Sequence, residues 1–364
     1  MKATRASSNR LYYLDWVRGV GAIVMLQGHA FDSFLKPELR PGPAYTLSQF
    51  VGGMPPAIFL FLTGVTLAFL MDSTERKQLP ARQRFLTALG RSRYLFLLAF
   101  AFRLQLFVFG FPAAWQDLFR VDILNCMGIS MALLAVTALA RTRDRAWIGA
   151  ALGLAVVFAS PLVSSMNWSG VPWIVRNYLA PGYGSFSFFP WGGFLAFGVA
   201  MGSLIRIARD DGAQRLMQGA AAAGAALVLG GQYCAGSPYT LYPKSDFWLN
   251  SPAQTLTKLG ATLLLVVAAF VWTRYGPTGG WSWVRQFGIT SLLVYWVHIE
   301  LVYGRAFWFL KNNLTVPQTV VSAVGLVLLM LTISTTRTYW HRVRAVLDDL
   351  GWDFGPRPER IPAD

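Results

Sequence analysis

The sequence predicts an all-α polytopic membrane protein with about ten transmembrane helices and both termini in the cytoplasm. Composition gives the first reason, because 54% of the 364 residues are hydrophobic and only 13% are charged, about half the charged share of an ordinary soluble domain. Apolar windows of about 20 residues, the length that crosses about 30 Å of hydrocarbon, recur along the whole chain. Lys and Arg are concentrated in alternate loops, as expected when those loops face the cytoplasm.

The predicted spans follow these apolar windows in order. They lie near residues 12–35, 50–71, 93–111, 123–140, 146–165, 187–205, 216–235, 253–272, 286–304 and 317–336. With the N-terminus inside, the inner segments hold 22 of the 32 Lys and Arg residues, the outer loops hold 7, and 3 lie within spans. We therefore expect an integral protein of a bacterial cytoplasmic (inner) membrane, with a transmembrane domain over residues 1–337 and a cytoplasmic tail over 338–364.

Charge and cysteine content narrow the class of protein further. The formal charge of +15 comes from short basic clusters between apolar segments, which the positive-inside rule explains better than a nucleic-acid-binding surface does. The basic N-terminal head and first apolar run resemble a signal peptide but lack a small-residue cleavage site, so we expect a retained first span. Cys126 and Cys234 fall near the outer ends of predicted spans, where two buried thiols are favoured over a disulfide.

The first span carries four ionisable side chains on one stripe. Arg18 and His29 are eleven positions apart, which on a helix means about 20° in azimuth and about 16.5 Å in depth. Asp15 falls one turn before Arg18, and Asp32 falls one turn after His29. Ionisable groups inside a span normally face the bundle interior and mark a site.

Two interpretations of this stripe stay open at the level of sequence. Asp15 and Arg18 are spaced for a structural ion pair at the membrane interface, with Arg18 reaching toward lipid phosphates, or for a role in binding a ligand. His29 is interpreted as a general base rather than a structural histidine, because Asp32 is placed to hold one ring nitrogen and leave the other free.

Several segments together resemble a known family. They are, in order, "RLYYLDWVRGVGAIVMLQGHAF", "PPAIFLFLTGVTLAF", "VDILNCMGIS", "FFPWGGFLAFGVAMG" and "GITSLLVYWVHIEL". This series resembles the heparan-alpha-glucosaminide N-acetyltransferase-like membrane proteins of the transmembrane acyltransferase superfamily, whose acyltransferase family 3 members share an Arg-x10-His pattern that Arg18 and His29 match. The resemblance implies transfer of an acetyl or other acyl group from cytoplasmic acyl-CoA to an acceptor on the far side, with His29 as base or transient acyl carrier.

The same resemblance extends to a second histidine. Ser291, Tyr295 and His298 share one helix face and look like the Ser-x3-Tyr-x2-His pattern near the end of related acyltransferases. It implies that His298 takes part in catalysis with His29 and Asp32, and that Tyr295 and Ser291 contact substrate. A packing role for His298, with its polar tip satisfied, is the alternative.

Arg103 needs a buried anion in the third predicted span, and Asp15, Asp122 and a bound phosphate are the candidates. A structural pair is favoured for it, while binding of acyl-CoA together with Arg18 and Asp15 is the functional alternative. Asn125 is a candidate contact to substrate, although Asp122 and Asn125 are first explained as a helix N-cap.

Packing and metal chemistry give two further expectations. Gly198 and Gly202 share one helix face, the spacing that lets a neighbouring helix approach closely. The three histidines and two cysteines are not spaced as a ligand set, so we predict that the protein uses no metal.

The sequence alone leaves more than one interpretation of the outer loops and of the acceptor. The segment "CAGSPYTLYPKSDFWLNSPAQ" is rich in aromatic, amide and hydroxyl side chains, which is typical of an interfacial belt and also suits a platform for a glycan. The rival class is a proton-coupled secondary transporter or exporter of a glycan or lipid, with Arg18, His29 and Asp32 as a proton relay. The sequence leaves the acceptor, the contacts with membrane lipids and the oligomeric state open, a homodimer included.

Overall fold

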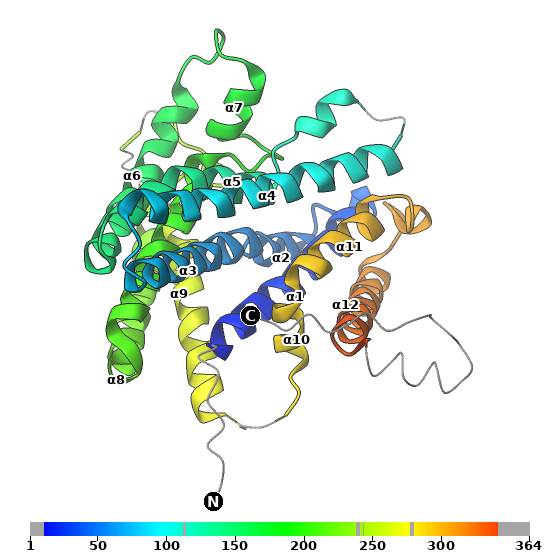
Figure 1. Cartoon of the computed structure of the whole chain (residues 1–364). Helices are drawn as coiled ribbons and strands as arrows, with labels where there is room; N and C mark the ends of the chain where they lie inside the picture. The colour runs from blue at the N-terminus through cyan, green and yellow to red at the C-terminus, as the bar shows by residue number, and fades with distance from the viewer. Residues whose placement is uncertain (1–10, 112–113, 238–240, 243, 277–279, 341–364) are drawn as a thin grey trace, which may run out of the picture.

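The computed structural model describes residues 11–111, 114–237, 241–242, 244–276 and 280–340, and within them the chain is helical (Figure 1). The N-terminal basic head and most of the predicted cytoplasmic tail lie outside these residues. The elements are α1 Tyr12–Phe34, η1 Pro37–Leu39, α2 Pro43–Gly52, α3 Pro55–Arg76, α4 Ala81–Phe109, η2 Trp115–Phe119, α5 Ile123–Leu134, η3 Ala135–Leu139, α6 Thr142–Ser165, α7 Trp173–Leu179, α8 Phe188–Ala235, α9 Pro252–Tyr275, α10 Trp283–Ile289, α11 Ser291–Tyr303, η4 Trp308–Leu310 and α12 Val316–Thr338.

Seven helical segments within the described residues are long and apolar enough to cross a membrane. They are Pro43–Arg76, Ala81–Phe109, Trp115–Leu139, Thr142–Ser165, Phe188–Arg209, Pro252–Tyr275 and Val316–Thr338. The all-helical membrane class is therefore confirmed. The other three predicted spans fall on α1, on the second part of α8 and on the α10–α11 pair, so the count of ten and the cytoplasmic termini stay predictions.

Two of these three elements differ from a simple span. The helix assignment of α8 runs over 48 residues without the predicted loop between its two halves, but Arg209 breaks it with φ 50° and ψ −163°. The segment predicted as the ninth span is divided at Thr290, where α10 ends and α11 begins. The sequence therefore located the interruption of α8 between residues 205 and 216, but hydropathy averages over a window and does not detect a break as short as the one at Thr290.

Helix α1 joins two apolar cores. Its N-terminal half contributes Tyr13, Leu14 and Val17 to the larger core, which also draws on α3, α4, α5, α8 and α9. Its C-terminal half contributes Leu26 and Phe34 to a smaller core with α10, α11 and α12. In Figure 1 α6 and α8 lie on the left and α12 on the right, with α1 between them. Side chains of α1 can therefore meet groups from both halves of the molecule.

Close backbone contacts fix α1 against α10 and α3 against α8. A Cβ on Gly19 would meet the Val284 carbonyl oxygen at 1.8 Å, so α1 and α10 can touch only because that position has no side chain. Added Cβ atoms on Gly198 and Gly202 would meet carbonyl oxygens of α3 at 2.0 and 2.7 Å. The close helix approach predicted from the Gly198 and Gly202 spacing is therefore confirmed.

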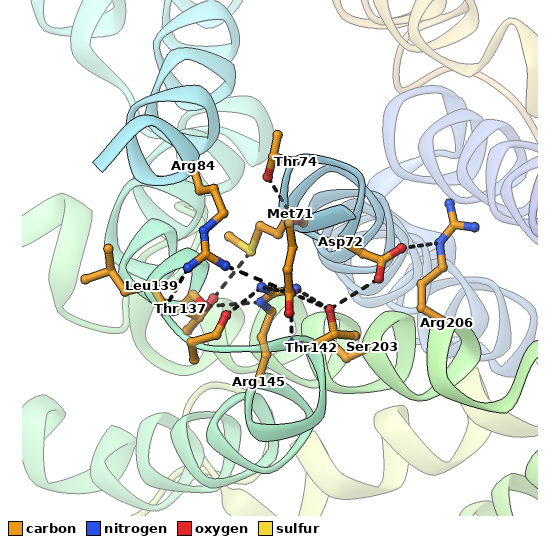
Figure 2. A network of polar contacts seen from close by, with 12 residues as sticks. Met71, Asp72, Thr74, Arg84, Thr137, Leu139, Thr142, Arg145, Ser203 and Arg206 are labelled. Atoms are coloured by element: carbon orange, nitrogen blue, oxygen red, sulfur yellow. Dashed lines mark hydrogen bonds and ion pairs between the residues drawn. The ribbon is translucent and has the colours of Figure 1, made fainter. Parts of the chain in front are cut away.

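A polar network ties the C-terminal end of α3, the first turns of α4 and α6, η3 and the middle of α8 together (Figure 2). The guanidinium of Arg145 is fully buried, and Nη2 lies 3.2 Å from the Glu75 carboxylate. Its three nitrogens donate to the Thr137 and Ala140 carbonyl oxygens, to the Thr142 hydroxyl and to Glu75. Asp72 lies beside it and pairs with Arg206 at 3.5 Å.

The two cysteines do not pair. Cys126 is a buried free thiol and Cys234 is an exposed one. The favoured prediction of two separate thiols is therefore confirmed, and the prediction that both are buried is wrong for Cys234.

Candidate active site

The packing of α1 on α11 brings His29 and His298 together. Nδ1 of His29 lies 2.8 Å from Nε2 of His298, although the two residues are 269 positions apart in sequence. His298 is fully buried, whereas His29 keeps part of its surface exposed. The pair therefore places one ring in the protein interior and leaves the other accessible.

Hydrogen bonding fixes which nitrogen of each neutral ring carries the proton. Nδ1 of His298 lies 2.6 Å from the Val294 carbonyl oxygen, and a carbonyl only accepts, so this nitrogen carries the hydrogen. Nε2 of His298 is then an acceptor and receives the Nδ1 hydrogen of His29. Within the described residues no hydrogen-bond donor meets the remaining nitrogen, Nε2 of His29, so its lone pair is free, which is what a general base or nucleophile needs.

Asp32 lies beside this pair in a different role from the expected one. Its carboxylate accepts hydrogen bonds from the hydroxyls of Tyr45 at 3.2 Å and Tyr303 at 2.8 Å, whereas the His29 nitrogen that Asp32 was expected to hold bonds to His298. The Tyr303 ring packs edge-on against His29 with 5.4 Å between ring centroids. Asp32 therefore touches His29 through Tyr303 and not by a hydrogen bond to the imidazole.

Tyr45 and Tyr303 are members of this site that the sequence did not reveal. Tyr303 comes five residues after His298, off the face that carries Ser291, Tyr295 and His298. A Tyr at the outer end of a span normally reads as part of the aromatic belt. Tyr45 lies in α2, whose apolar sequence gives no sign of a contact with α1.

Tyr295 and Ser291 lie on α11, on the N-terminal side of His298. The Tyr295 ring lies 6.0 Å from His298 and 5.3 Å from Phe102 of α4, measured between ring centroids. Ser291 is the first residue of α11 and is half-buried. Both positions remain predicted substrate contacts.

At the other end of α1, Asp15 and Arg18 form the ion pair that their spacing allowed. Nη1 of Arg18 lies 3.1 Å from Asp15, and 23% of the Arg18 side chain is exposed while Asp15 is buried. Around this end three more guanidiniums lie over aromatic rings, namely Arg206 over Phe69 at 4.2 Å, Arg285 over Tyr12 at 5.0 Å and Arg274 over Phe270 at 5.7 Å. The N-terminal end of α1 is therefore a cationic region.

Arg103 pairs with Asp122, one of the anions considered for it, with 3.1 Å between Nε and the carboxylate. Asp122 and Asn125 also form the expected cap of α5, each side chain accepting from the other residue's backbone N–H at 3.0 and 3.3 Å. The Asn125 amide donates to the Tyr178 hydroxyl at 3.0 Å, and burial raises the pKa of that phenol. These contacts account structurally for Arg103 and Asn125; roles in donor or substrate binding stay predictions.

Comparison with known families gives a match over most of the chain. The profile described as heparan-alpha-glucosaminide N-acetyltransferase, catalytic, matches residues 10–233. The matched segment runs from the start of α1 into the end of α8, so it contains His29 and Asp32, while His298 and Tyr303 lie beyond it. No curated protein matches the chain. Within the described residues, no group of three or more His, Cys, Asp or Glu side chains is gathered to hold a metal ion.

Proposed function

Because this chain belongs to the heparan-alpha-glucosaminide N-acetyltransferase catalytic family, we propose that it transfers an acetyl group from cytoplasmic acetyl-CoA to a hydroxyl or amine of a glycan acceptor at the outer face of the membrane. The observation that carries the proposal is the hydrogen-bonded pair of His29 and His298. It provides one imidazole nitrogen with a free lone pair inside a membrane helix bundle, and little in a purely structural role requires that arrangement.

Direct transfer is the simpler mechanism. Nε2 of His29 accepts the proton of the acceptor hydroxyl or amine as that oxygen or nitrogen attacks the thioester carbonyl carbon. The new ester or amide bond forms, the carbon–sulfur bond breaks, and the CoA thiolate takes the proton back from His29. His298 holds the ring of His29 and shares the positive charge that forms on it in the transition state.

Transfer through an acetyl-histidine uses the same geometry. Nε2 of His29 attacks the thioester, CoA leaves as the thiolate, and the acetyl group stays on the ring. The Nδ1 proton then passes to Nε2 of His298, which is its hydrogen-bond acceptor. The acceptor subsequently attacks the acetyl carbon and the bond from that carbon to Nε2 of His29 breaks; His298 returns its proton to Nδ1 of His29, and the acceptor proton passes to the CoA thiolate.

The length of α1 suits an acetyl-CoA donor that enters from the cytoplasmic side, opposite to the acceptor. Arg18 and His29 are separated by about 16.5 Å along the helix axis, a distance that a pantetheine arm spans when it is extended. The phosphates of CoA would bind near Arg18 and the guanidiniums around it, as cations and bidentate donors bind phosphate. Arg18 and Arg206 are already paired with carboxylates, so Arg274 and Arg285 supply the charge that these pairs do not.

Donor binding and thioester cleavage test the proposal without knowledge of the acceptor. Acetyl-CoA binding to the detergent-purified protein is measured by calorimetry, and release of the CoA thiol is followed with water as the acceptor. We expect wild-type protein to bind acetyl-CoA, and His29→Ala to keep that binding but lose thiol release by about 10²-fold or more. Arg18→Ala should weaken both. The control is Thr262→Ala, which removes a buried hydroxyl bonded within α9.

The same experiment also tests two alternatives, a transfer mechanism without His29 and a transporter function. Full thiol release by His29→Ala would remove His29 from the mechanism. Folded wild-type protein that does not bind acetyl-CoA would instead favour a proton-coupled transporter, because a chain of two hydrogen-bonded imidazoles also conducts protons.

A further inference from the structure

A polar pocket lies outside the histidine pair and has no role in the mechanism above. It has a volume of about 350 Å³ and is formed by the segment from Arg120 to Val121, by the end of α7 and by residues 180–185. Two arginines line it, Arg120 and Arg176, together with Asn177 and Tyr183. Two cations, an amide and an aromatic ring around one concave space form a set of binding groups for an anionic sugar.

The pocket wall is held in place by hydrogen bonds. Nε and Nη2 of Arg120 donate to the Gly184 carbonyl oxygen at 3.3 and 3.1 Å. Gly184 has φ 76°, a backbone conformation that favours glycine, and a Cβ there would approach the Arg120 guanidinium to 3.3 Å. The loop and the arginine therefore fix each other, and the guanidinium is in place before any ligand arrives.

The aromatic wall is fixed as well. The Tyr183 hydroxyl donates to the Asp246 carboxylate at 2.7 Å, and this hydrogen bond raises the pKa of the phenol. The ring is 73% exposed, so its face is open to a ligand while its hydroxyl is occupied. An exposed aromatic face held in one orientation suits the C–H face of a sugar ring.

The charges of the pocket are not balanced by the protein. Within the described residues, neither Arg120 nor Arg176 has a carboxylate within ion-pair distance, whereas Arg18, Arg103 and Arg145 each have one. Asp246 accepts a hydrogen bond from Tyr183 at the wall and keeps its negative charge, so the two arginines exceed it by one positive charge. Arg176 is exposed. The pocket is therefore cationic and free to bind an anion.

The pocket and the histidine pair are predicted to lie toward the same side of the membrane. Arg120 and Arg176 lie in segments predicted to face the outside, and the Asp32 end of α1 is predicted to lie on that same side. A ligand held by Arg120 and Arg176 would therefore lie on the side from which the acceptor is proposed to reach the histidine pair.

We propose that this pocket, the anion pocket, binds an anionic sugar unit of the acceptor through Arg120, Arg176 and Tyr183. The inference rests on the proposed function, since it names the class of acceptor for that reaction. The carboxylate of a uronic acid and the phosphate of a sugar phosphate share the chemistry that the two guanidiniums recognise.

Three sugars of similar size test the anion pocket on the full-length protein in detergent. Binding of D-glucuronate, D-glucose 6-phosphate and D-glucose is measured by ligand-observed NMR in the absence of acetyl-CoA. We expect at least one anionic sugar to bind about tenfold more tightly than glucose, with the stronger of the two identifying the group as carboxylate or phosphate. The preference should shrink as salt is raised.

Two substitutions and a control assign that preference to the pocket. Arg176→Gln removes an exposed side chain with no hydrogen bond in the described residues and should fold normally, whereas Arg120→Gln also loses the bonds to Gly184. We expect each to reduce the preference for the anionic sugar about fivefold or more, and Lys36→Gln, which removes a cation outside the pocket, to leave it unchanged. No preference in the wild-type protein, or a preference that survives Arg176→Gln, would overturn the inference.

Acetyl-CoA binding to the same samples separates the two proposals. If acetyl-CoA binds but the sugars show no preference, the anion pocket is wrong and the proposed function stands. If the sugars show the preference and acetyl-CoA does not bind, the proposed transfer reaction is wrong.

Discussion

Two buried polar clusters of this protein differ in how completely their atoms are paired. In the network around Arg145, all three guanidinium nitrogens donate hydrogen bonds and the charge faces Glu75 (Figure 2). In the pair of His29 and His298, three ring nitrogens have assigned roles and the fourth, Nε2 of His29, keeps a free lone pair. A saturated cluster stabilises a fold, whereas a cluster with one open position is available for chemistry.

The positions of the two clusters also indicate a structural role for the Arg145 network and a catalytic role for the histidine pair. The Arg145 network joins five helical elements, so its loss affects how they pack. The histidine pair lies between α1 and α11, where Ala22, Leu26 and Val294 already hold the helices together through apolar packing. We therefore expect substitutions in the first cluster to change mainly stability and substitutions in the second to change mainly rate.

The largest expected effect on stability is that of Arg145→Ala. It takes the buried guanidinium from Glu75, which then keeps Arg84 at 4.0 Å and the Thr142 donors, and it removes the donors to two backbone carbonyls, so we expect a loss of about 3 kcal/mol of folding free energy. Thermal unfolding of the detergent-purified protein measures it. Arg91→Ala, which removes an exposed arginine of the neighbouring helix α4, is the matched control and should change stability by about 0.5 kcal/mol or less. Equal effects of the two substitutions would show that the network is not structural.

Most of the fold class could be predicted because the signals are local. Hydropathy over about 20 residues and the alternation of basic loops indicate a helical membrane protein without any knowledge of contacts. The same holds for contacts within one helix, such as the Asp15–Arg18 pair and the cap that Asp122 makes with Asn125. The interruption predicted between residues 205 and 216 is present as a kink at Arg209, whereas the break at Thr290 was not predicted, because it changes few residues in an otherwise helical and apolar sequence.

The site was predictable only in part, because its key contacts join distant segments. His29 and His298 were both identified, yet their direct hydrogen bond depends on how α1 packs on α11. Helix geometry alone placed Asp32 as the partner of His29, since it considers only neighbours on the same helix. Tyr45 and Tyr303 compete for that carboxylate from other helices, and nothing in their local sequence indicates it.

His298→Ala tests whether the second histidine acts on the rate through His29. The substitution removes the acceptor of the Nδ1 hydrogen, so the His29 ring can rotate or exchange tautomers. We expect thiol release from acetyl-CoA to fall about 10–100-fold, as for other residues that orient a reacting side chain. His298→Gln, which keeps an acceptor on a side chain of similar reach, should recover part of the rate.

The pH dependence separates positioning from simple loss of folded protein. A variant that only unfolds in part keeps the shape of the wild-type pH profile and loses amplitude. A change in the bonding of His29 shifts the profile, because the acidity of that ring depends on its partner. An unshifted profile with unchanged rate would show that His298 is a packing residue.

Asp32→Asn is expected to have the smallest effect of these substitutions. The amide oxygen of Asn can still accept from one of the two tyrosine hydroxyls, so Tyr303 keeps most of its position against His29 and the rate should fall about threefold to tenfold. Tyr303→Phe is the matched variant, since it keeps the ring beside His29 and removes only the hydroxyl, and it should match Asp32→Asn if the carboxylate acts through that hydroxyl. A much larger loss for Asp32→Asn than for Tyr303→Phe, measured as thiol release, would mean that the charge of Asp32 acts on His29 itself. In that case the carboxylate stabilises the imidazolium formed during transfer. The histidine pair would then depend on a nearby opposite charge, as Arg145 depends on Glu75.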